Sequence, residues 1–140
     1  MPSEFLRFPF FGQDREFNAA GALPYLPITL TYGNATLDAM GLLDTGASVN
    51  VLPYGLGRQL GAAWERQTVS VRLTGNLADF EARALVVTAT VGTFAPVRLA
   101  FAWTRAERTP LLLGQVNFFQ EFDVCFFRQR GVFEVRPAYS

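Results

Sequence analysis

The segment that most constrains this chain is residues 42–48, which read Leu-Leu-Asp-Thr-Gly-Ala-Ser. Apolar residues before Asp44 predict a strand that ends at this carboxylate. Gly46 and its small neighbours predict a sharp turn directly afterwards, because glycine adopts backbone angles closed to other residues. In such a turn, backbone N–H groups point at the carboxylate, hold it in place and favour its ionised form. Asp44 is therefore the first candidate for chemistry in this sequence.

The residues that the chain lacks exclude several kinds of catalytic and metal site. The sequence of 140 residues contains no His and a single Cys, Cys125. Ser-His and Cys-His nucleophilic machinery, His-ligated metals and Cys-cluster zinc sites are excluded, as is an internal disulfide. We expect no metal and no cofactor, so hydrolysis would have to rest on carboxylates. Cys125 lies in an apolar run and is predicted to be a small buried hydrophobe.

Charge and hydropathy narrow the expected partners and location. The formal net charge is zero and charges of both signs are interspersed, so neither nucleic acid nor a membrane surface is indicated. No apolar stretch is long enough to span a bilayer, and the N-terminus lacks the apolar core of a signal peptide. The single Cys suits a reducing compartment such as the cytoplasm, but the compartment itself stays unknown. Half of the residues are hydrophobic, which indicates either a buried subunit interface or a dense core.

Short alternating segments predict an all-β fold. Alternation of apolar and polar residues, or a short apolar run, predicts strands at 25–32, 35–43, 68–73, 80–86, 97–103, 124–127 and 132–135. A nearly continuous apolar run at 85–91 predicts a strand buried on both faces, and short helices are predicted at 52–60 and 117–122. The runs on either side of loop 74–79 predict a β-hairpin. Many short strands with one or two short helices indicate a barrel-like domain.

The chain divides into an N-terminal arm and one domain. Residues 23–140 carry the predicted strands and are long enough to bury a core. Residues 1–22 show no clear period and are predicted to form an arm. This arm packs onto the domain or a partner subunit, or it is a strand or loop that closes the chain's own core.

A second segment of the same type follows at residues 110–114, where Pro-Leu-Leu-Leu runs into a glycine and leads to an apolar segment at 116–122. With residues 42–48, this pairing resembles the retropepsin-like aspartic proteases, the retroviral-type single-domain family. The resemblance covers about residues 23–135. It implies an all-β acid-protease barrel with a flap hairpin and one or two short helices. In that family the first segment carries the catalytic aspartate, and the second supports it and leads into a helix.

The resemblance implies roles for residues of both loops. Peptide hydrolysis by carboxylates needs two of them sharing one proton, so that one acts as general base and the other as general acid. The chain has a single Asp-Thr-Gly, so a homodimer would supply the second Asp44 across a two-fold axis. Thr45 would hydrogen-bond across that axis, and Gly46 would let the two loops approach. Peptide or protein substrate would contact Ala47, Ser48, Asn50 and the flap residues Thr74, Gly75, Asn76 and Leu77.

Two departures from the family pattern leave a choice between functions. Retroviral members carry acidic residues where this chain has Ser48-Val49-Asn50, and usually Arg where it has Gln115. The contacts that stabilise the retroviral dimer are therefore not reproduced. The leading interpretation is a homodimeric aspartic endopeptidase of the bacterial or retroviral-like type. The alternatives are a catalytically weak or inactive domain of this fold that binds peptide or protein, and a small β-barrel with a chance motif.

Overall fold

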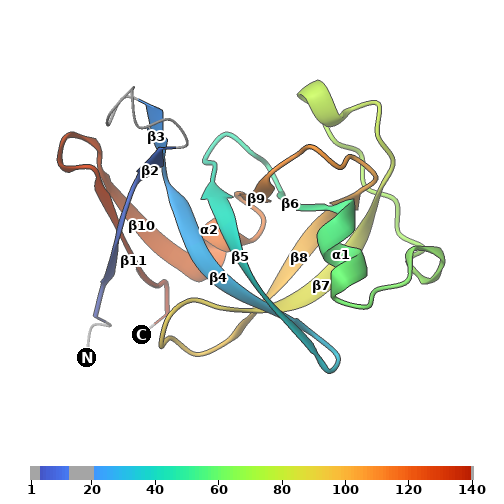
Figure 1. The fold of residues 1–140 in the computed structure, drawn as a ribbon, viewed down its shortest axis with the longest axis horizontal. Helices are drawn as coiled ribbons and strands as arrows, with labels where there is room; N and C mark the ends of the chain where they lie inside the picture. The colour runs from blue at the N-terminus through green and yellow to red at the C-terminus, as the bar shows by residue number, and fades with distance from the viewer. Residues whose placement is uncertain (1–3, 13–20, 140) are drawn as a thin grey trace.

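The computed structural model describes residues 4–12 and 21–139 of the chain. They form a mostly β fold with a closed six-stranded barrel, a separate three-stranded sheet and two short helices (Figure 1). The barrel strands follow the order β4-β5-β9-β6-β8-β7. In chain order the strands are β1 (Leu6–Pro9), β2 (Phe11–Gly12), β3 (Ala22–Leu23), β4 (Tyr25–Tyr32), β5 (Ala35–Leu43), β6 (Asn50–Pro53), β7 (Ala82–Thr90), β8 (Val97–Thr104), β9 (Leu111–Leu113), β10 (Phe122–Phe127) and β11 (Val132–Pro137).

Alternation in the sequence accounts for the first barrel hairpin. Strands β4 and β5 pair along their whole length, with a turn at Gly33 in the left-handed conformation (φ 59°). Ile28 and Leu30 are buried, and Thr29 between them is half-exposed, as the alternation predicted. The predicted bounds 25–32 and 35–43 are confirmed. Strand β5 therefore ends one residue before Asp44.

Both predicted helices are confirmed, although each is shorter than the pattern suggested. Helix α1 spans Tyr54–Gln59 and α2 spans Phe118–Glu121. Pro53 stands directly before the first turn of α1, where its missing N–H costs no hydrogen bond. Neither helix in the described part of the chain is long and apolar enough to cross a membrane.

Two predictions between residues 68 and 91 are wrong: the strand at 68–73, and the burial of residues 85–91 on both faces. Residues 68–73 form no continuous strand; they pair with β7 at a single bridge, Ser70 to Arg83. Val69 in this segment is 61% exposed, whereas Leu73 at its end is buried, so only part of the segment packs against the rest of the fold. The run at 85–91 belongs to β7, and Val86 within it is 45% exposed. An antiparallel strand of this barrel buries only its inner face, so the apolar run does not mean burial on both sides.

Cys125 is exposed, so its predicted burial is also wrong. It lies on β10, an outer strand of the sheet with order β1-β11-β10. Phe122 on this strand faces the core, whereas Asp123 is exposed and its carboxylate lies 3.3 Å from Arg136. Alternation places Cys125 on the same outer side as Asp123. Its apolar neighbours in sequence therefore did not determine its burial.

The described part of the N-terminal arm closes a sheet of its own chain. Strand β1 pairs antiparallel with β11, and the Phe8 ring stacks on Phe133 with 5.6 Å between centroids. Strand β2 pairs with β3. Residues 6–12 therefore follow the alternative in which the arm adds a strand to its own fold. Residues 1–3 and 13–20 of the predicted arm lie outside the described residues, and the boundary at residue 22 stays a prediction.

An aromatic cluster joins α1 to the barrel. The indole of Trp103 is completely buried, stacks on Tyr54 and donates from Nε1 to the Tyr54 carbonyl oxygen at 3.1 Å. Trp64 meets the same indole edge-on, with 5.2 Å between centroids. Gly57 of α1 packs directly against Trp103, and a Cβ there would come within 2.7 Å of the ring carbon Cζ2. The helix can approach the barrel this closely only because residue 57 has no side chain.

Replacing Gly57 with alanine should therefore destabilise the fold by about 1–3 kcal/mol, since the added methyl group overpacks the indole. Gly55 provides a matched control on the same helix, because a Cβ there meets nothing within 4 Å. Gly55→Ala should leave stability unchanged or raise it by up to ~1 kcal/mol through helix propensity. Urea unfolding of the two variants measures the difference. Equal stabilities would contradict the packing argument.

Candidate active site

The two apolar-to-glycine segments lie side by side at the ends of their strands. Strand β5 pairs in parallel with β9, so that Leu43 is opposite Leu113. The pairing continues one step further, where the Asp44 N–H donates to the Leu113 carbonyl oxygen at 3.0 Å. Asp44 therefore begins its turn while still hydrogen-bonded to the second segment, and β9 holds its backbone in place.

The turn after Asp44 holds its side chain. The Gly46 N–H donates to the Asp44 carboxylate oxygen Oδ1 at 2.9 Å, and the Ala47 N–H donates to the Asp44 carbonyl oxygen at 3.1 Å. The carboxylate is half-buried. This N–H bond orients one oxygen of the carboxylate. The carboxylate thus has a defined orientation at a position that solvent or a ligand can reach.

Residues 45–49 run alongside residues 114–117 and are hydrogen-bonded to them. The N–H groups of Gln115 and Val116 donate to the carbonyl oxygens of Ala47 and Ser48, each at 2.9 Å. Gly114 fits into the space between the two segments. A Cβ there would come within 2.7 Å of the Ala47 oxygen and closer still to that of Val49, so no larger residue fits without moving backbone.

Gln115 makes a contact that the sequence did not predict. Its side-chain Nε2 donates to the Thr45 carbonyl oxygen at 2.8 Å. The second segment thus supports the Asp-Thr-Gly turn through a side chain as well as through backbone groups. Thr45 itself is exposed at the tip of the turn.

Asn50 is completely buried, so the prediction that it binds substrate is wrong. Its Oδ1 accepts from the Gly114 N–H at 2.8 Å, and its Nδ2 donates to the Ala100 carbonyl oxygen at 3.0 Å. The same Nδ2 donates to Oδ1 of Asn117 at 3.1 Å. These bonds use the whole amide within the chain. A buried polar side chain needs such partners, and backbone groups of neighbouring strands supply them.

Asn117, which is half-buried, completes this polar network. Its Oδ1 also accepts from the Ala100 N–H at 3.0 Å, and its Nδ2 donates to the Arg98 carbonyl oxygen at 3.0 Å. The two asparagines therefore join β6, β8 and the segment after β9 behind the Asp44 turn. In the sequence, only the polar Asn50 between Val49 and Val51 could have indicated this network.

A cavity of about 190 Å³ opens at Asp44. Its floor includes the predicted site residues Gly46, Ala47 and Ser48, and its other side includes Thr74 and Leu77 of the hairpin loop. Gly75, Asn76 and Thr45 are not among its lining residues. The cavity also has an apolar wall that sequence analysis missed, formed by Val49, Val51, Leu73 and Leu112.

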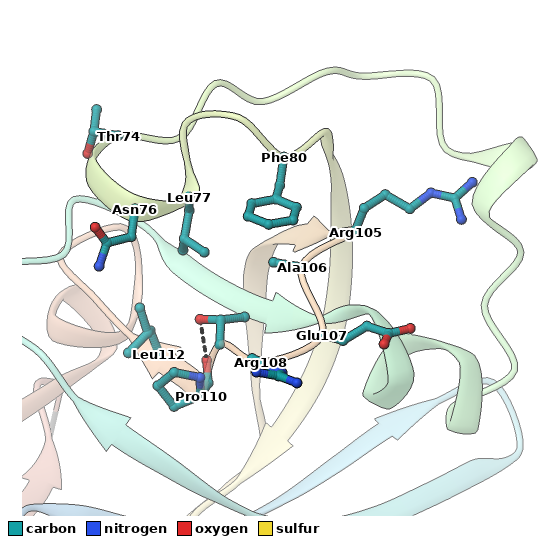
Figure 2. Close-up of a pocket in the computed structure, with 11 residues that line it drawn as sticks. Thr74, Asn76, Leu77, Phe80, Arg105, Ala106, Glu107, Arg108, Pro110 and Leu112 are labelled. Atoms are coloured by element: carbon teal, nitrogen blue, oxygen red, sulfur yellow. Dashed lines mark hydrogen bonds between the residues drawn. The ribbon is translucent and has the colours of Figure 1, made fainter.

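A second cavity of about 750 Å³ lies between the hairpin loop and residues 105–110. In Figure 2, Leu77 and Phe80 point from the hairpin toward Ala106 and Leu112 on the opposite side. Asn76 also lines this cavity, and Thr74, Leu77 and Leu112 line both cavities, so the two adjoin. The interior is mostly apolar, and charged residues stand at its rim: Arg105, Glu107 and Arg108.

Arg105 at this rim is already engaged by aromatic rings. Figure 2 shows it pointing away from Leu77 and Leu112, and its guanidinium lies 4.6 Å from the Trp64 ring centroid and 4.7 Å from that of Tyr54. It is therefore a structural cation over the aromatic cluster. Sequence analysis missed the residues at 105–110 because loops far apart in sequence bring them together with Phe80.

Known proteins were compared with this chain by sequence and by structure. No family model and no curated protein matches the sequence. A retropepsin-like aspartic protease from Rickettsia conorii matches the structure over 96% of this chain and 94% of its own, with a TM-score of 0.63 and 14% identity. EIAV protease complexed with the inhibitor HBY-793 matches over 70% of this chain and 86% of its own, with a TM-score of 0.56 and 18% identity.

The chain has a retropepsin-like fold. The closed barrel and the two short helices match those neighbours, and the all-β acid-protease barrel predicted from the sequence is confirmed. Within this retropepsin-like fold, Asp44 is at the tip of a barrel strand beside the second apolar-to-glycine segment. At these identities the likeness concerns the fold, so the chemistry has to be argued from the residues themselves.

The hydrogen bonds of the buried Asn50 predict that its replacement will lower the stability of the fold. Asn50→Ala removes the acceptor of the Gly114 N–H and leaves buried polar groups without partners, which should destabilise the fold by about 1–3 kcal/mol. Ser48→Ala, two residues away on the exposed turn, should change stability by less than ~0.5 kcal/mol. Chemical unfolding monitored by tryptophan fluorescence compares the two variants. If both are as stable as the wild type, the network does not support the turn.

Proposed function

We propose that this chain is an aspartic endopeptidase that hydrolyses peptide bonds as a homodimer, using a water molecule activated between two Asp44 carboxylates. The observation that carries the proposal is the position of Asp44. Its carboxylate is oriented by the Gly46 N–H, its backbone is held by Leu113, and it lines a cavity beneath a hairpin loop. A fixed carboxylate at the floor of a covered cavity is the arrangement that acid–base hydrolysis requires.

The chemistry divides between the two carboxyl groups. Two carboxyls that face each other at close range cannot both ionise, so they share one proton. The ionised group takes a proton from water as general base, and the water oxygen attacks the scissile carbonyl. The protonated group donates a hydrogen bond to the carbonyl oxygen, on which charge develops in the transition state. Proton transfer to the amine then completes cleavage.

The second carboxylate is assigned to another copy because other acidic residues are engaged elsewhere. Asp38 accepts from the Thr29 hydroxyl at 2.8 Å, Glu81 pairs with Arg83 at 3.0 Å, and Glu134 pairs with Arg7 at 2.6 Å. Glu107 lines the larger cavity but not the one that contains Asp44. A two-fold axis beside Asp44 would place an identical carboxylate opposite the first.

The turn residues have supporting roles in this proposal. Thr45 is exposed at the tip, and Gln115 fixes its carbonyl oxygen, so its hydroxyl is free to bond across the axis. Gly46 adds no side chain between the two turns, which allows their close approach. Ala47 and Ser48 form the floor of the Asp44 cavity, where the backbone of a peptide would lie.

The hairpin loop is the proposed flap. Thr74 and Leu77 face both cavities, Asn76 faces the larger one, and Gly75 has the left-handed conformation (φ 63°) that turns the loop. A peptide extended through the adjoining cavities would lie between this loop and the Asp44 turn. Because the larger cavity is mostly apolar, it would favour apolar side chains of the substrate.

One observation favours the alternative of a domain that binds peptide or protein without cutting it. Ser48 and Gln115 stand where the retroviral family carries charged groups, and Gln115 bonds within its own chain. A dimer without those ionic contacts would have to be stabilised in another way. If the dimer does not form, Asp44 lacks the second carboxylate, and the cavities can bind peptide or protein but not cleave it.

Asp44→Asn should abolish peptide cleavage without loss of stability. Asparagine has nearly the same shape and still accepts from the Gly46 N–H, but it cannot act as a base. The matched control is Asp38→Asn on the same strand, which should retain wild-type activity. Digestion of an unfolded protein, followed by mass spectrometry, measures cleavage. A highly purified Asp44→Asn preparation that cleaves at the wild-type rate would remove Asp44 from the mechanism.

Adding excess Asp44→Asn chain to wild-type enzyme should inhibit it, because mixed dimers hold only one carboxylate. By mass action, a ninefold excess should leave about one tenth of the activity per wild-type chain. An equal mass of an inert protein is the control. Specific activity of the wild type should also fall on dilution. Constant activity in both experiments would show that one chain acts alone.

A further inference from the structure

Residues 105–110 form one side of the larger cavity, and the start of this loop determines where that side lies. The loop is opposite Leu77 and Phe80 of the hairpin loop (Figure 2). Within the described part of the chain, residues 107–109 make no hydrogen bond to another segment. Strand β9 fixes the end of the loop from Leu111 onward. The position of this side of the cavity therefore depends on how the first residues of the loop are held.

Backbone hydrogen bonds attach the start of the loop at two places. The Arg105 N–H donates to the Glu81 carbonyl oxygen at 2.9 Å, at the base of the hairpin. Ala106 is buried, and its N–H donates to the Thr104 hydroxyl oxygen at 3.1 Å. The Ala106 carbonyl oxygen accepts from the Tyr54 N–H at 3.4 Å. This last bond is long, so it holds the loop against α1 only weakly.

The side chain of Arg105 adds a contact that links the loop to the hairpin through the aromatic cluster. Its guanidinium lies 4.6 Å from the Trp64 ring centroid and 4.7 Å from that of Tyr54. A cation over an aromatic face is attracted by the ring electrons. Arg83, at the base of the hairpin, lies 4.5 Å from the same Trp64 centroid and donates from Nη1 to the Trp64 carbonyl oxygen at 2.8 Å. Both sides of the larger cavity are therefore connected to Trp64, which is buried.

We infer that Arg105 is a positioning residue for substrate selection. Its contact with the aromatic cluster holds residues 106–110 at the distance from the hairpin loop at which the larger cavity accepts large apolar side chains of a peptide. The inference deepens the proposed function and rests on it, because a peptide must occupy the cavity. The volume of about 750 Å³ is within the range of pockets that enclose a small molecule. A large side chain contacts both sides of such a cavity and depends on their separation, whereas a small side chain does not.

The test is the dissociation constant of two blocked hexapeptides, one with phenylalanine and one with valine at both central positions. Calorimetry measures it in the Asp44→Asn background, which prevents cleavage. Arg105→Ala should raise the constant of the phenylalanine peptide by about tenfold, because the loop loses its contact with the rings. The constant of the valine peptide should stay within about twofold of the parent. Arg105→Lys keeps a cation over the rings and should restore the phenylalanine peptide to within about threefold.

Arg58→Ala is the matched control for loss of a cation at the aromatic cluster. The Arg58 guanidinium lies 5.9 Å from the centroid of the same Tyr54 ring, but it belongs to α1 and lines neither cavity. Its replacement should leave both dissociation constants within about twofold of the parent. Urea unfolding and circular dichroism establish that each variant is folded. If Arg105→Ala weakens both peptides equally, or if Arg105→Lys binds as poorly as Arg105→Ala, the positioning role is overturned.

Cleavage of the same peptides by chains that retain Asp44 separates this inference from the proposed function. Arg105→Ala should raise KM for the phenylalanine peptide and leave kcat unchanged, because the loop acts on binding and not on the carboxylates. If the peptides bind with the expected pattern but no form of the chain cleaves them, the role of Arg105 stands and the endopeptidase proposal falls. If the wild type cleaves but Arg105→Ala binds both peptides like the parent, only the role of Arg105 falls. A parent that binds both peptides equally, or neither, also overturns it, because the cavity then selects no large side chain.

Discussion

The parallel pairing of β5 with β9 is the interaction on which the candidate site depends. It places Leu113 beside Leu43 and lets the Leu113 carbonyl oxygen accept from the Asp44 N–H. Gly114 then passes so close to the carbonyl oxygens of the Asp44 turn that only glycine fits. A slip of one residue in this pairing would turn the side chains to the opposite face of the sheet and remove both contacts. The carboxylate is positioned because two strand ends meet.

Behind the turn, the side-chain amides of buried Asn50 and half-buried Asn117 connect neighbouring segments of the chain. Asn50 and Asn117 satisfy backbone N–H and C=O groups of β8 and of Gly114. Because the amide groups of this network have hydrogen-bond partners, their burial does not lower the stability of the fold. The same hydrogen bonds specify one arrangement of the loops. Gln115 extends this support to Thr45. The turn is thus held by hydrogen bonds from the second segment within the single chain, which is the support that a catalytic or binding carboxylate needs.

Sequence periodicity predicted the strands and helices well where the burial of their residues follows that periodicity. The bounds of β4 and β5 and the presence of both short helices could be predicted from alternation and spacing. The errors at Val69, Val86, Cys125 and Asn50 share one cause. Alternation reports which residues point the same way, but whether that side is covered depends on neighbours elsewhere in the chain. The cavity residues at 105–110 were missed for the same reason, since they meet Phe80 only in the folded chain.

The sequence by itself determined the strand–Asp–turn segment, restricted hydrolytic chemistry to carboxylates, and limited each chain to one Asp-Thr-Gly. Those properties follow from residue identity and short-range geometry, which any fold must respect. Only the tertiary structure decided that Asn50 faces inward to Gly114, 64 residues away, and that Thr74 and Leu77 of the hairpin loop line the cavity that contains Asp44. Such pairings depend on which strands close the barrel. That outcome is set by packing of the whole chain, and no local period encodes it.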